Sequence, residues 1–239
     1  MTGDGPSFDG RVAVVTGGAS GIGAALVERL KTRGVLVASL DVRAAPASDL
    51  SFEVDVGDAD AVLRAVHRIN SELGPPTLAV HCAGITRDAM LWKLAVEDWE
   101  SVLRVNLSGA WFLLRAMVPY MRTAGTGSVV FVGSINGARG KIGQSAYAAS
   151  KAGLVGVAKT AARELGRFGV RVNVVAPGFV ETPMTAALAD EFRAKAIAET
   201  AVGRVADPGD IVGAIEFLLS PAARHITGHV LNVDGGQDM

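Results

Sequence analysis

The sequence predicts an α/β protein built on one doubly wound parallel sheet. Short runs rich in Val and Ile alternate with longer segments of helical periodicity. A glycine-rich turn separates the first such run from the first helical segment. The chain has 239 residues, 49% of them hydrophobic, which is enough for one large core. In such a fold, right-handed crossovers place ligands at the carboxyl ends of the strands, so we expect the functional site at that edge.

Seven short runs qualify as strands, and segments with helical periodicity separate most of them. The predicted strands are Arg11–Thr16, Val35–Asp41, Ser51–Val56, Thr77–Cys82, Ser128–Ser134, Val170–Ala176 and His229–Asp234. Together they predict a seven-stranded parallel sheet with helices on both faces, the Rossmann arrangement. No repeat or low-complexity tract interrupts the alternation. We therefore assign residues 1–239 to a single dinucleotide-binding and catalytic domain.

Composition excludes several classes of function. The formal net charge of −1 argues against nucleic acid or an anionic membrane as a general partner. No run of about 18 apolar residues occurs, so no membrane-spanning helix is expected. The segment Met1–Gly10 lacks the basic and apolar regions of a secretory signal, which predicts a cytoplasmic protein. Cys82 is the single cysteine, and the four histidines show no metal-ligand spacing with it, so neither a disulfide nor a metal site is expected.

The turn after the first strand has the composition of a dinucleotide cradle. Residues 16–23 read Thr-Gly-Gly-Ala-Ser-Gly-Ile-Gly, and a helical segment follows at once. Glycines permit the tight turn and leave room for a pyrophosphate, while the helix amino terminus offers free N–H groups. The residues that we assign to the cofactor here are Gly17, Ser20, Gly21, Ile22 and Gly23.

Acidic residues after the second and third strands refine the cofactor prediction. Asp41 ends the second strand and can accept hydrogen bonds from an adenosine ribose hydroxyl, whereas it would repel a 2′-phosphate. NAD is therefore favoured over NADP, although Arg43 could turn towards a phosphate. Asp55, followed by Val56, either reaches the adenine amino group or caps the helix that begins near Asp58.

Four residues together provide a reaction centre for hydride transfer. Tyr147 and Lys151 lie one helical turn apart, and a cation so close to a phenol favours the phenolate that acid–base catalysis needs. Ser134, at the end of the fifth strand, would hold the substrate oxygen. Asn106 would hold a water that links Lys151 to solvent, or else would satisfy a local distortion of its own helix.

These motifs resemble the short-chain dehydrogenase/reductase family in order and spacing across essentially the whole chain. The resemblance implies the catalytic set Asn106, Ser134, Tyr147 and Lys151 and a threonine, Thr182, that contacts the nicotinamide carboxamide. It also implies that Tyr147 and Lys151 contact the cofactor. The further cofactor positions that it implies are Ala83, Gly84, Pro177 and Gly178. One departure is present, because His81-Cys82 replaces the Asn-Asn pair that the family usually has before Ala-Gly. Cys82 is the poorer hydrogen bonder, and we interpret His81 as structural.

Three stretches, residues 84–88, 143–147 and 177–184, look most like the 3-oxoacyl-(acyl carrier protein) reductase branch of the family. Many members of that branch use NADPH, whereas Asp41 favours NAD. Our primary prediction is an NAD(H)-dependent enzyme that interconverts 3-oxoacyl and 3-hydroxyacyl thioesters. The alternatives are a dehydrogenase of another secondary alcohol or ketone, and a non-catalytic NAD-sensing protein, against which the intact catalytic set argues.

Partners and moving parts are predicted less directly. An acyl carrier protein would need a basic patch, and the available residues are Arg122, Arg139, Lys141, Arg163, Arg167 and Arg171. Small residues between Ala146 and Gly156 would let another helix approach, and the family commonly pairs this helix across subunits, so we expect a homotetramer. The same residues could instead pack on the chain's own sheet. Residues 183–203 read as a substrate lid or as an ordinary surface helix pair.

Overall fold

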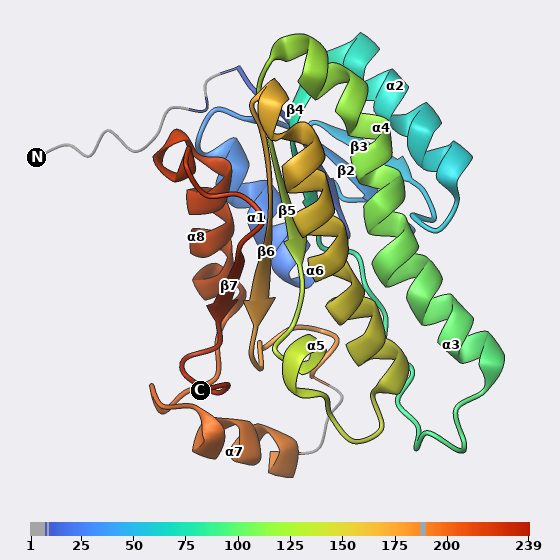
Figure 1. Cartoon of the computed structure of the whole chain (residues 1–239), viewed down its shortest axis with the longest axis vertical. Coiled ribbons are helices and arrows are strands. Elements are labelled where there is room, and N and C mark those ends of the chain that lie inside the picture. The colour runs from blue at the N-terminus through green and yellow to red at the C-terminus, as the bar shows by residue number, and fades with distance from the viewer. Residues whose placement is uncertain (1–7, 9, 187–189) are drawn as a thin grey trace, which may run out of the picture.

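A computed structural model describes residue 8 and residues 10–186 and 190–239. Most of the amino-terminal segment and part of the predicted lid lie outside these residues. All seven predicted strands form, and they join one parallel sheet in the order β3-β2-β1-β4-β5-β6-β7, which confirms the predicted fold (Figure 1). The strands are β1 Val12–Thr16, β2 Leu36–Asp41, β3 Leu50–Glu53, β4 Pro76–His81, β5 Gly127–Val132, β6 Val170–Pro177 and β7 Val230–Val233.

Helices lie on both faces of the sheet. The helices are α1 Gly21–Lys31, α2 Ala59–Leu73, α3 Val96–Leu103, α4 Gly109–Ala124, α5 Asn136–Arg139, α6 Ser145–Leu165, α7 Asp190–Glu199 and α8 Pro208–Leu219. In Figure 1, α2, α4 and α6 lie on one side of the strands, whereas α1 and α8 lie on the other. Short connections complete the described chain: a π-helical turn at Arg104–Ser108 and 3₁₀ turns at Gly166–Phe168 and Pro221–Ala223.

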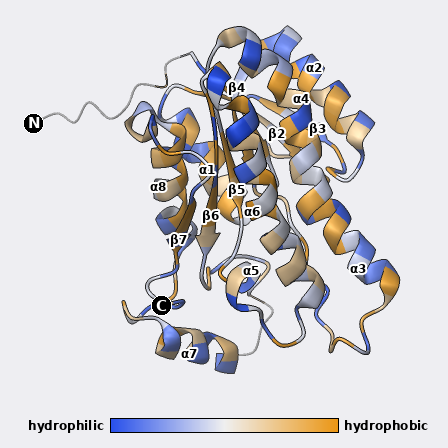
Figure 2. Ribbon diagram, in the orientation of Figure 1, coloured by the Kyte–Doolittle hydropathy of each residue, from blue (hydrophilic) through white to orange (hydrophobic). Residues whose placement is uncertain are grey.

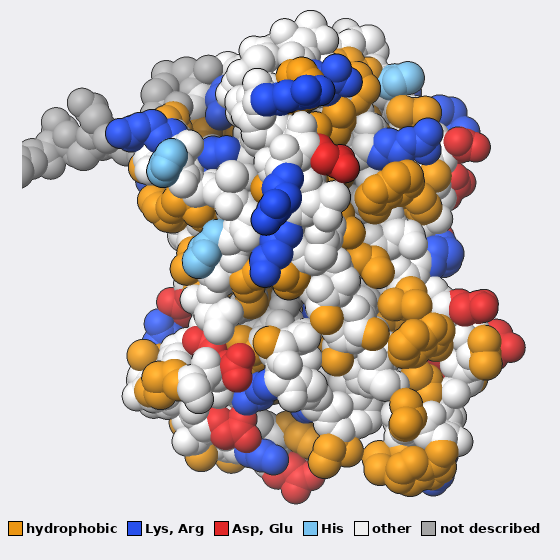
Figure 3. Space-filling model, in the orientation of Figure 1, with side chains coloured by type: hydrophobic (Ala, Val, Ile, Leu, Met, Phe, Trp, Pro, Cys, Tyr) orange, Lys and Arg blue, Asp and Glu red, His pale blue; other side chains and the backbone are white. Residues whose placement is uncertain are grey.

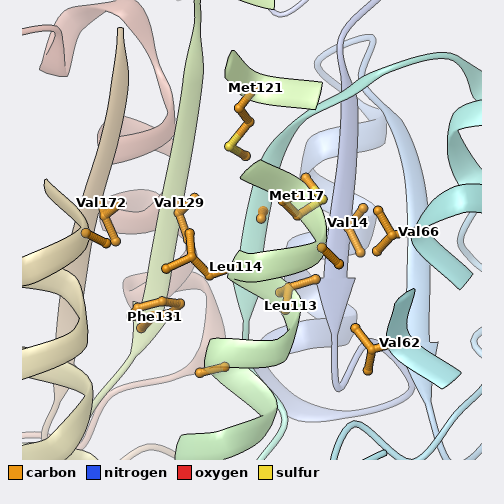
Figure 4. Packing of buried hydrophobic residues seen from close by; sticks show 14 of the residues in the cluster. Val14, Val62, Val66, Leu113, Leu114, Met117, Met121, Val129, Phe131 and Val172 are labelled. Atoms are coloured by element: carbon orange, nitrogen blue, oxygen red, sulfur yellow. The ribbon is translucent and has the colours of Figure 1, made fainter. Parts of the chain in front are cut away.

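Two hydrophobic clusters hold these layers together. The first packs α2, α4 and α6 onto one face of the sheet, and Figure 4 shows Leu113 and Met117 of α4 beside Val14 of β1. The second packs α1 and α8 onto the opposite face through side chains such as Leu26 and Ile215. The central strands are buried on both sides, which explains why they read as continuous apolar runs and appear orange in Figure 2.

Two local predictions were wrong in detail. The third strand ends at Glu53, so Asp55 lies in the connection to α2 rather than within the strand. The helix expected around Asn106 is interrupted, because the π-helical turn separates α3 from α4. Within the described residues, no helix is long and apolar enough to cross a membrane.

The topology brings the predicted site residues to one edge of the sheet. β1 pairs with β2 on one side and with β4 on the other, so the winding reverses between β1 and β4. The loops that follow β1, β4, β5 and β6 therefore all meet at the carboxyl edge of these strands.

Candidate active site

A cavity of about 1320 Å³ opens at this edge. It is lined by every residue that the sequence assigned to the cofactor or to catalysis except Asn106. Those lining residues are Gly17, Ser20, Gly21, Ile22, Gly23, Asp41, Asp55, Val56, Ala83, Gly84, Ser134, Tyr147, Lys151, Pro177, Gly178 and Thr182. The loops that carry these residues are separated in the sequence, and in the structure they converge on one cavity.

Two glycines of the turn, Gly17 and Gly23, have no room for a side chain. A Cβ atom on Gly17 would lie 2.7 Å from the backbone nitrogen of Ala83, and one on Gly23 would overlap the carbonyl oxygen of Gly17. Gly17 and Gly21 also have positive φ angles, of 71° and 56°. Ser20 is the N-cap of α1 but makes no side-chain cap bond, and the first turn of α1 contains no acidic residue. These features fit the pyrophosphate of a dinucleotide, which would meet open N–H groups and the positive end of the helix dipole.

Asp41 both supports the turn and faces the cavity. Its Oδ2 atom accepts a hydrogen bond from the backbone N–H of Ala19 at 3.1 Å, and its Oδ1 atom accepts one from the N–H of Arg43 at 3.1 Å. The side chain of Arg43 is largely exposed and donates to the Ser20 hydroxyl at 3.0 Å. A carboxylate and a guanidinium therefore lie together beside the turn, and the NAD preference remains a prediction.

Asp55 is tied to the π-helical turn. Arg104 donates to its Oδ2 atom at 2.6 Å, and the backbone N–H of Gly57 donates to its Oδ1 atom at 2.8 Å. The N-cap of α2 is Asp58, whose side chain accepts from two backbone N–H groups. Asp55 is therefore not the cap of that helix, and its carboxylate stays at the cavity wall.

Tyr147 lies in the first turn of α6, where burial dominates its acid–base behaviour. Desolvation raises the pKa of Tyr147, the negative charge of Asp88 raises it further, and the neighbouring Ser134 hydroxyl opposes the shift. This direction is opposite to the one expected from the Tyr–Lys spacing. The ammonium of Lys151 lies 5.5 Å from the centroid of the phenol ring, and burial is the largest influence on the pKa of the phenol. Tyr147 is therefore protonated near neutral pH.

Lys151 lies one turn further along α6. Its Nζ atom donates to the carbonyl oxygen of Val132 at 2.8 Å, at the end of β5. Burial lowers the pKa of Lys151 to about 8. A group with this pKa can change its protonation state under physiological conditions, unlike an exposed lysine.

Asn106 is fully buried in the π-helical turn. Its Oδ1 atom accepts from the N–H of Ile85 at 2.8 Å, and its Nδ2 atom donates to the carbonyl of Ile85 at 3.0 Å and to the Ser150 hydroxyl at 3.0 Å. Asn106 thus occupies a helix distortion, but its side chain bonds the loop after β4 rather than its own helix. A Cβ atom on Gly84 would lie 3.4 Å from Oδ1 of Asn106 and 3.5 Å from Nζ of Lys151, so both side chains face Gly84.

His81 and Cys82 occupy the position of the usual asparagine pair. The ring of His81 is fully buried, and its Nδ1 atom lies 2.9 Å from the Thr16 hydroxyl, which also accepts from the N–H of Ala83. Burial lowers the pKa of His81 to about 3, so the ring is neutral. Burial raises the pKa of Cys82 to about 12, so it remains a thiol. Thr16 and His81 therefore supply a hydrogen-bonded link between β1 and β4.

The segment after β6 contributes the remaining wall. Thr182 lies against the glycine turn, because a Cβ atom on Gly21 would be 3.5 Å from that of Thr182. From α7, the side chains of Phe192, Lys195 and Glu199 reach the cavity. Residues 187–189, inside the predicted lid of 183–203, lie outside the described residues, and the lid function remains a prediction.

Three further residues line the same cavity, although the sequence pattern assigned them no role at the site: Asp88, Asn136 and Gln144. Asn136 donates to Gln144 at 3.0 Å, and Gln144 donates to Asp88 at 2.9 Å. Asp88 lies in the loop after β4, whereas Asn136 begins α5 and Gln144 precedes α6. Polar residues in such connecting segments carry no periodicity that reveals a contact. The available signal was the family resemblance of the stretches 84–88 and 143–147, which contain Asp88 and Gln144.

Of the basic residues considered for carrier docking, Arg139 and Lys141 line the cavity, whereas Arg122, Arg167 and Arg171 do not. Arg171 donates to backbone carbonyls at the end of α8, including that of Leu218 at 2.7 Å. Arg122 and Arg167 both stack on Phe168. In Figure 3, Lys and Arg side chains lie singly or in short runs, and hydrophobic side chains gather at the lower right of this face. Within the described part of the chain, no group of three or more His, Cys, Asp or Glu side chains could hold a metal ion.

Comparison with known proteins agrees with this geometry. A family model described as enoyl-(acyl carrier protein) reductase matches residues 17–238. The 3-oxoacyl-[acyl-carrier-protein] reductase FabG of Salmonella typhimurium is 38% identical, over 98% of this chain and 99% of its own length. The (3R)-3-hydroxyacyl-CoA dehydrogenase of Rattus norvegicus is 38% identical, over 94% and 95%. The acetoacetyl-CoA reductase of Synechocystis is 41% identical, over 95% and 96%.

Proposed function

The chain belongs to the short-chain dehydrogenase/reductase family of oxidoreductases, and from this membership we propose that it interconverts 3-oxoacyl and 3-hydroxyacyl thioesters with NAD(H). The observation that carries the proposal is the agreement among relatives. Three that align over at least 94% of this chain are all named for 3-oxoacyl or 3-hydroxyacyl thioesters, on acyl carrier protein or on CoA. The cavity supports it, because Ser134, Tyr147 and Lys151 all line it.

The residues of the cavity fit a nicotinamide dinucleotide. The glycine turn and the start of α1 would hold the pyrophosphate, Asp41 the adenosine ribose, and Thr182 the carboxamide. When bound, the cofactor supplies or accepts the hydride at the carbon that carries the substrate oxygen. Asp55 and Val56 would border the adenine, and Ala83, Gly84, Pro177 and Gly178 would pack along the ring system.

Tyr147 is our proposed general acid and base. In the direction of reduction, the phenol donates its proton to the substrate oxygen while the Ser134 hydroxyl holds that oxygen in place. The raised pKa of Tyr147 keeps the phenol protonated at neutral pH, which is the form that reduction requires. The charge of Lys151 then stabilises the phenolate that remains. Oxidation uses the same groups in reverse.

The proton must return from solvent to Tyr147 after each reduction. Asn106 uses one lone pair of Oδ1 for Ile85, which leaves a second lone pair for a water. That water would connect Lys151 to solvent, because both side chains face Gly84. The role of Asn106 is thus to position the proton route rather than to touch the substrate.

The test is steady-state consumption of NADH and of NADPH with acetoacetyl-CoA, beside a panel of simple ketones. Rapid NADH-linked reduction of the thioester is the expected result. Activity confined to simple ketones would move the assignment to a general secondary-alcohol dehydrogenase. NADH binding without turnover of any substrate would favour the third alternative, a non-catalytic NAD-sensing protein.

Replacement of Tyr147 by Phe tests the acid–base role within this assay. We expect the variant to lose at least about a thousandfold in kcat while NADH affinity, measured by fluorescence titration, stays within about threefold. The reason is that the change removes the proton donor but keeps the ring. An equal loss of NADH affinity would instead assign Tyr147 a structural role.

A further inference from the structure

A chain of side-chain hydrogen bonds crosses the cavity wall and links the loop after β4 with α5 and with the residue that precedes α6. Gln144 donates through Nε2 to Oδ2 of Asp88 at 2.9 Å, and its Oε1 atom accepts from Nδ2 of Asn136 at 3.0 Å. The other oxygen of Asp88 accepts from the Thr86 hydroxyl, and Arg139 donates to Oδ1 of Asn136 at 3.1 Å. All five residues line the cavity. The loop after β4, the loop after β5 and the start of α6 are therefore joined.

Gln144 is the centre of this chain and is 9% exposed. Both ends of its amide are used, one as acceptor and one as donor, so its orientation is fixed by its partners. Gln144 is also the N-cap residue of α6, and its carbonyl oxygen accepts from the N–H of Ala148 at 2.8 Å. The first turn of α6 contains Tyr147, so a shift of Gln144 moves the backbone from which the Tyr147 side chain extends.

The same chain reaches Ser134. The backbone N–H of Asn136 donates to Oγ of Ser134 at 3.1 Å, while the side chain of Asn136 donates to Gln144. The Ser134 hydroxyl and the Tyr147 phenol are the two groups proposed to contact the substrate oxygen. One short path of bonds joins them, from Ser134 through Asn136 and Gln144 to the first turn of α6, which carries Tyr147. The backbone bond from Ala89 N–H to the Gly143 carbonyl, at 2.9 Å, braces the loop beside it.

We propose that Gln144 is a positioning residue that, through Asn136 and Asp88, fixes the Ser134 hydroxyl and the Tyr147 phenol relative to each other. This inference rests on the proposed function, because it gives Tyr147 and Ser134 their catalytic roles. A displacement of about 1 Å between such groups can cost about a hundredfold in rate. The bonds of Gln144 are directional, so the proposal depends on the donor facing Asp88 and not on the volume of the side chain.

The test variant is Gln144→Glu, which keeps the size and the acceptor for Asn136 but turns a carboxylate towards Asp88. The two like charges repel, so the link to Asp88 breaks. With acetoacetyl-CoA we expect kcat to fall by roughly 10- to 100-fold. We expect the KM for NADH to change by less than about threefold, because the chain touches none of the proposed pyrophosphate contacts.

The double variant Gln144→Glu/Asp88→Asn restores the bonds with reversed polarity. The amide of the new asparagine donates to the new glutamate and still accepts from Thr86, and the net charge equals that of the wild type. We expect kcat to return to within about threefold of the wild-type value. A side chain that acted by contacting substrate would not be rescued by a change at residue 88.

The matched control is Glu72→Gln, which exchanges a carboxylate for an amide. Glu72 belongs to the exposed Arg68–Glu72 ion pair of α2. It should leave kcat within about twofold of wild type. If Gln144→Glu does not fold, as judged by its melting temperature, Gln144→Met removes both bonds without adding charge and should show the same loss of kcat.

Two results would overturn the inference: wild-type kcat in the single variant, or a double variant no more active than the single one. Failure of the proposed function gives a different pattern. In that case the wild type does not turn over the thioester, or Tyr147→Phe retains activity. Because these reference measurements use residues outside the Asp88–Gln144–Asn136 chain, the two failures are distinguishable.

Discussion

At the scale of single residues, burial shifts Tyr147 and Lys151 towards their neutral forms. Desolvation raises the pKa of the phenol and lowers that of the ammonium to about 8. Below that value the pair consists of a neutral phenol and a charged lysine. This combination is ready to donate a proton to a carbonyl oxygen and to stabilise the phenolate that results. The resting protonation state therefore favours reduction.

The lysine pKa predicts a pH dependence. We expect kcat/KM for reduction by NADH to be constant near neutral pH and to fall above about pH 8, because Lys151 then loses the charge that stabilises the phenolate. The apparent pKa belongs to the Tyr147–Lys151 pair. Initial rates between pH 6 and 10 measure it. A Lys151→Arg variant, which stays charged, should move the fall upward, and an unchanged profile in that variant would refute the assignment.

Asp41 predicts the choice of cofactor. Replacement by Ala removes the negative charge beside the turn and leaves Arg43 next to Ser20. We expect the ratio of kcat/KM for NADPH to that for NADH to rise at least about tenfold, because like charges placed together cost several kcal/mol.

The control for Asp41 lies close by in the chain. Asp49 also accepts a backbone hydrogen bond, from Val37 of β2 at 2.8 Å, but does not line the cavity. An Asp49→Ala variant should leave the cofactor ratio unchanged. A ratio that stays fixed in Asp41→Ala would show that the aspartate serves only the backbone of Ala19 and Arg43.

At the scale of elements, the strands were more predictable than the connections. Buried parallel strands must be apolar on both faces, so β1, β4 and β5 appear as short uninterrupted runs, and their predicted ends agree to within two residues. The π-helical turn has no such signal, and the bonds that its Asn106 makes go to Ile85, 21 residues away. The link from Gln144 to Asp88 spans 56 residues. Contacts of this kind follow from tertiary packing, which a single sequence does not encode in a local pattern.

The π-helical turn predicts an unusual response to a helix mutation. Ala in place of Gly normally stabilises a helix by roughly 0.5–1 kcal/mol. At Gly109, the first residue of α4, a Cβ atom would lie 3.0 Å from a side-chain carbon of Val56 and 3.3 Å from the ring of His81. We therefore expect Gly109→Ala to lower the free energy of unfolding by about 1–3 kcal/mol, measured by urea denaturation.

Gly213 provides the comparison for Gly109. It lies within α8 and is exposed, and a Cβ atom added there would have no other atom within 4 Å. Gly213→Ala should therefore raise the free energy of unfolding by the usual helix-propensity amount. A stabilising effect of both substitutions would mean that the π-helical turn tolerates displacement of α4.

At the scale of the whole molecule, the two faces of the sheet are covered, but α6 still exposes small residues. Ala146 is buried, and a Cβ atom on Gly153 would lie 2.8 Å from Leu107, so these two residues pack within the chain. Ala149, Ala152 and Gly156 are exposed along one side of α6, and nothing lies within 4 Å of a Cβ position on Gly156. Packing within the chain therefore accounts for one part of the helix, and pairing across subunits remains a prediction for the exposed part.

The exposed side of α6 predicts assembly. We expect a homotetramer, with a mass in light scattering about four times the 24.6 kDa of one chain. Small residues let helices of two subunits approach closely, so Gly156→Arg should lower the mass by placing a long charged side chain in that contact. Gly213→Arg adds the same charge at an open position of α8 and should leave the mass unchanged. A monomeric wild type, or equal masses for the two variants, would show that α6 does not pair across subunits, since only Gly156 lies on its exposed small-residue side.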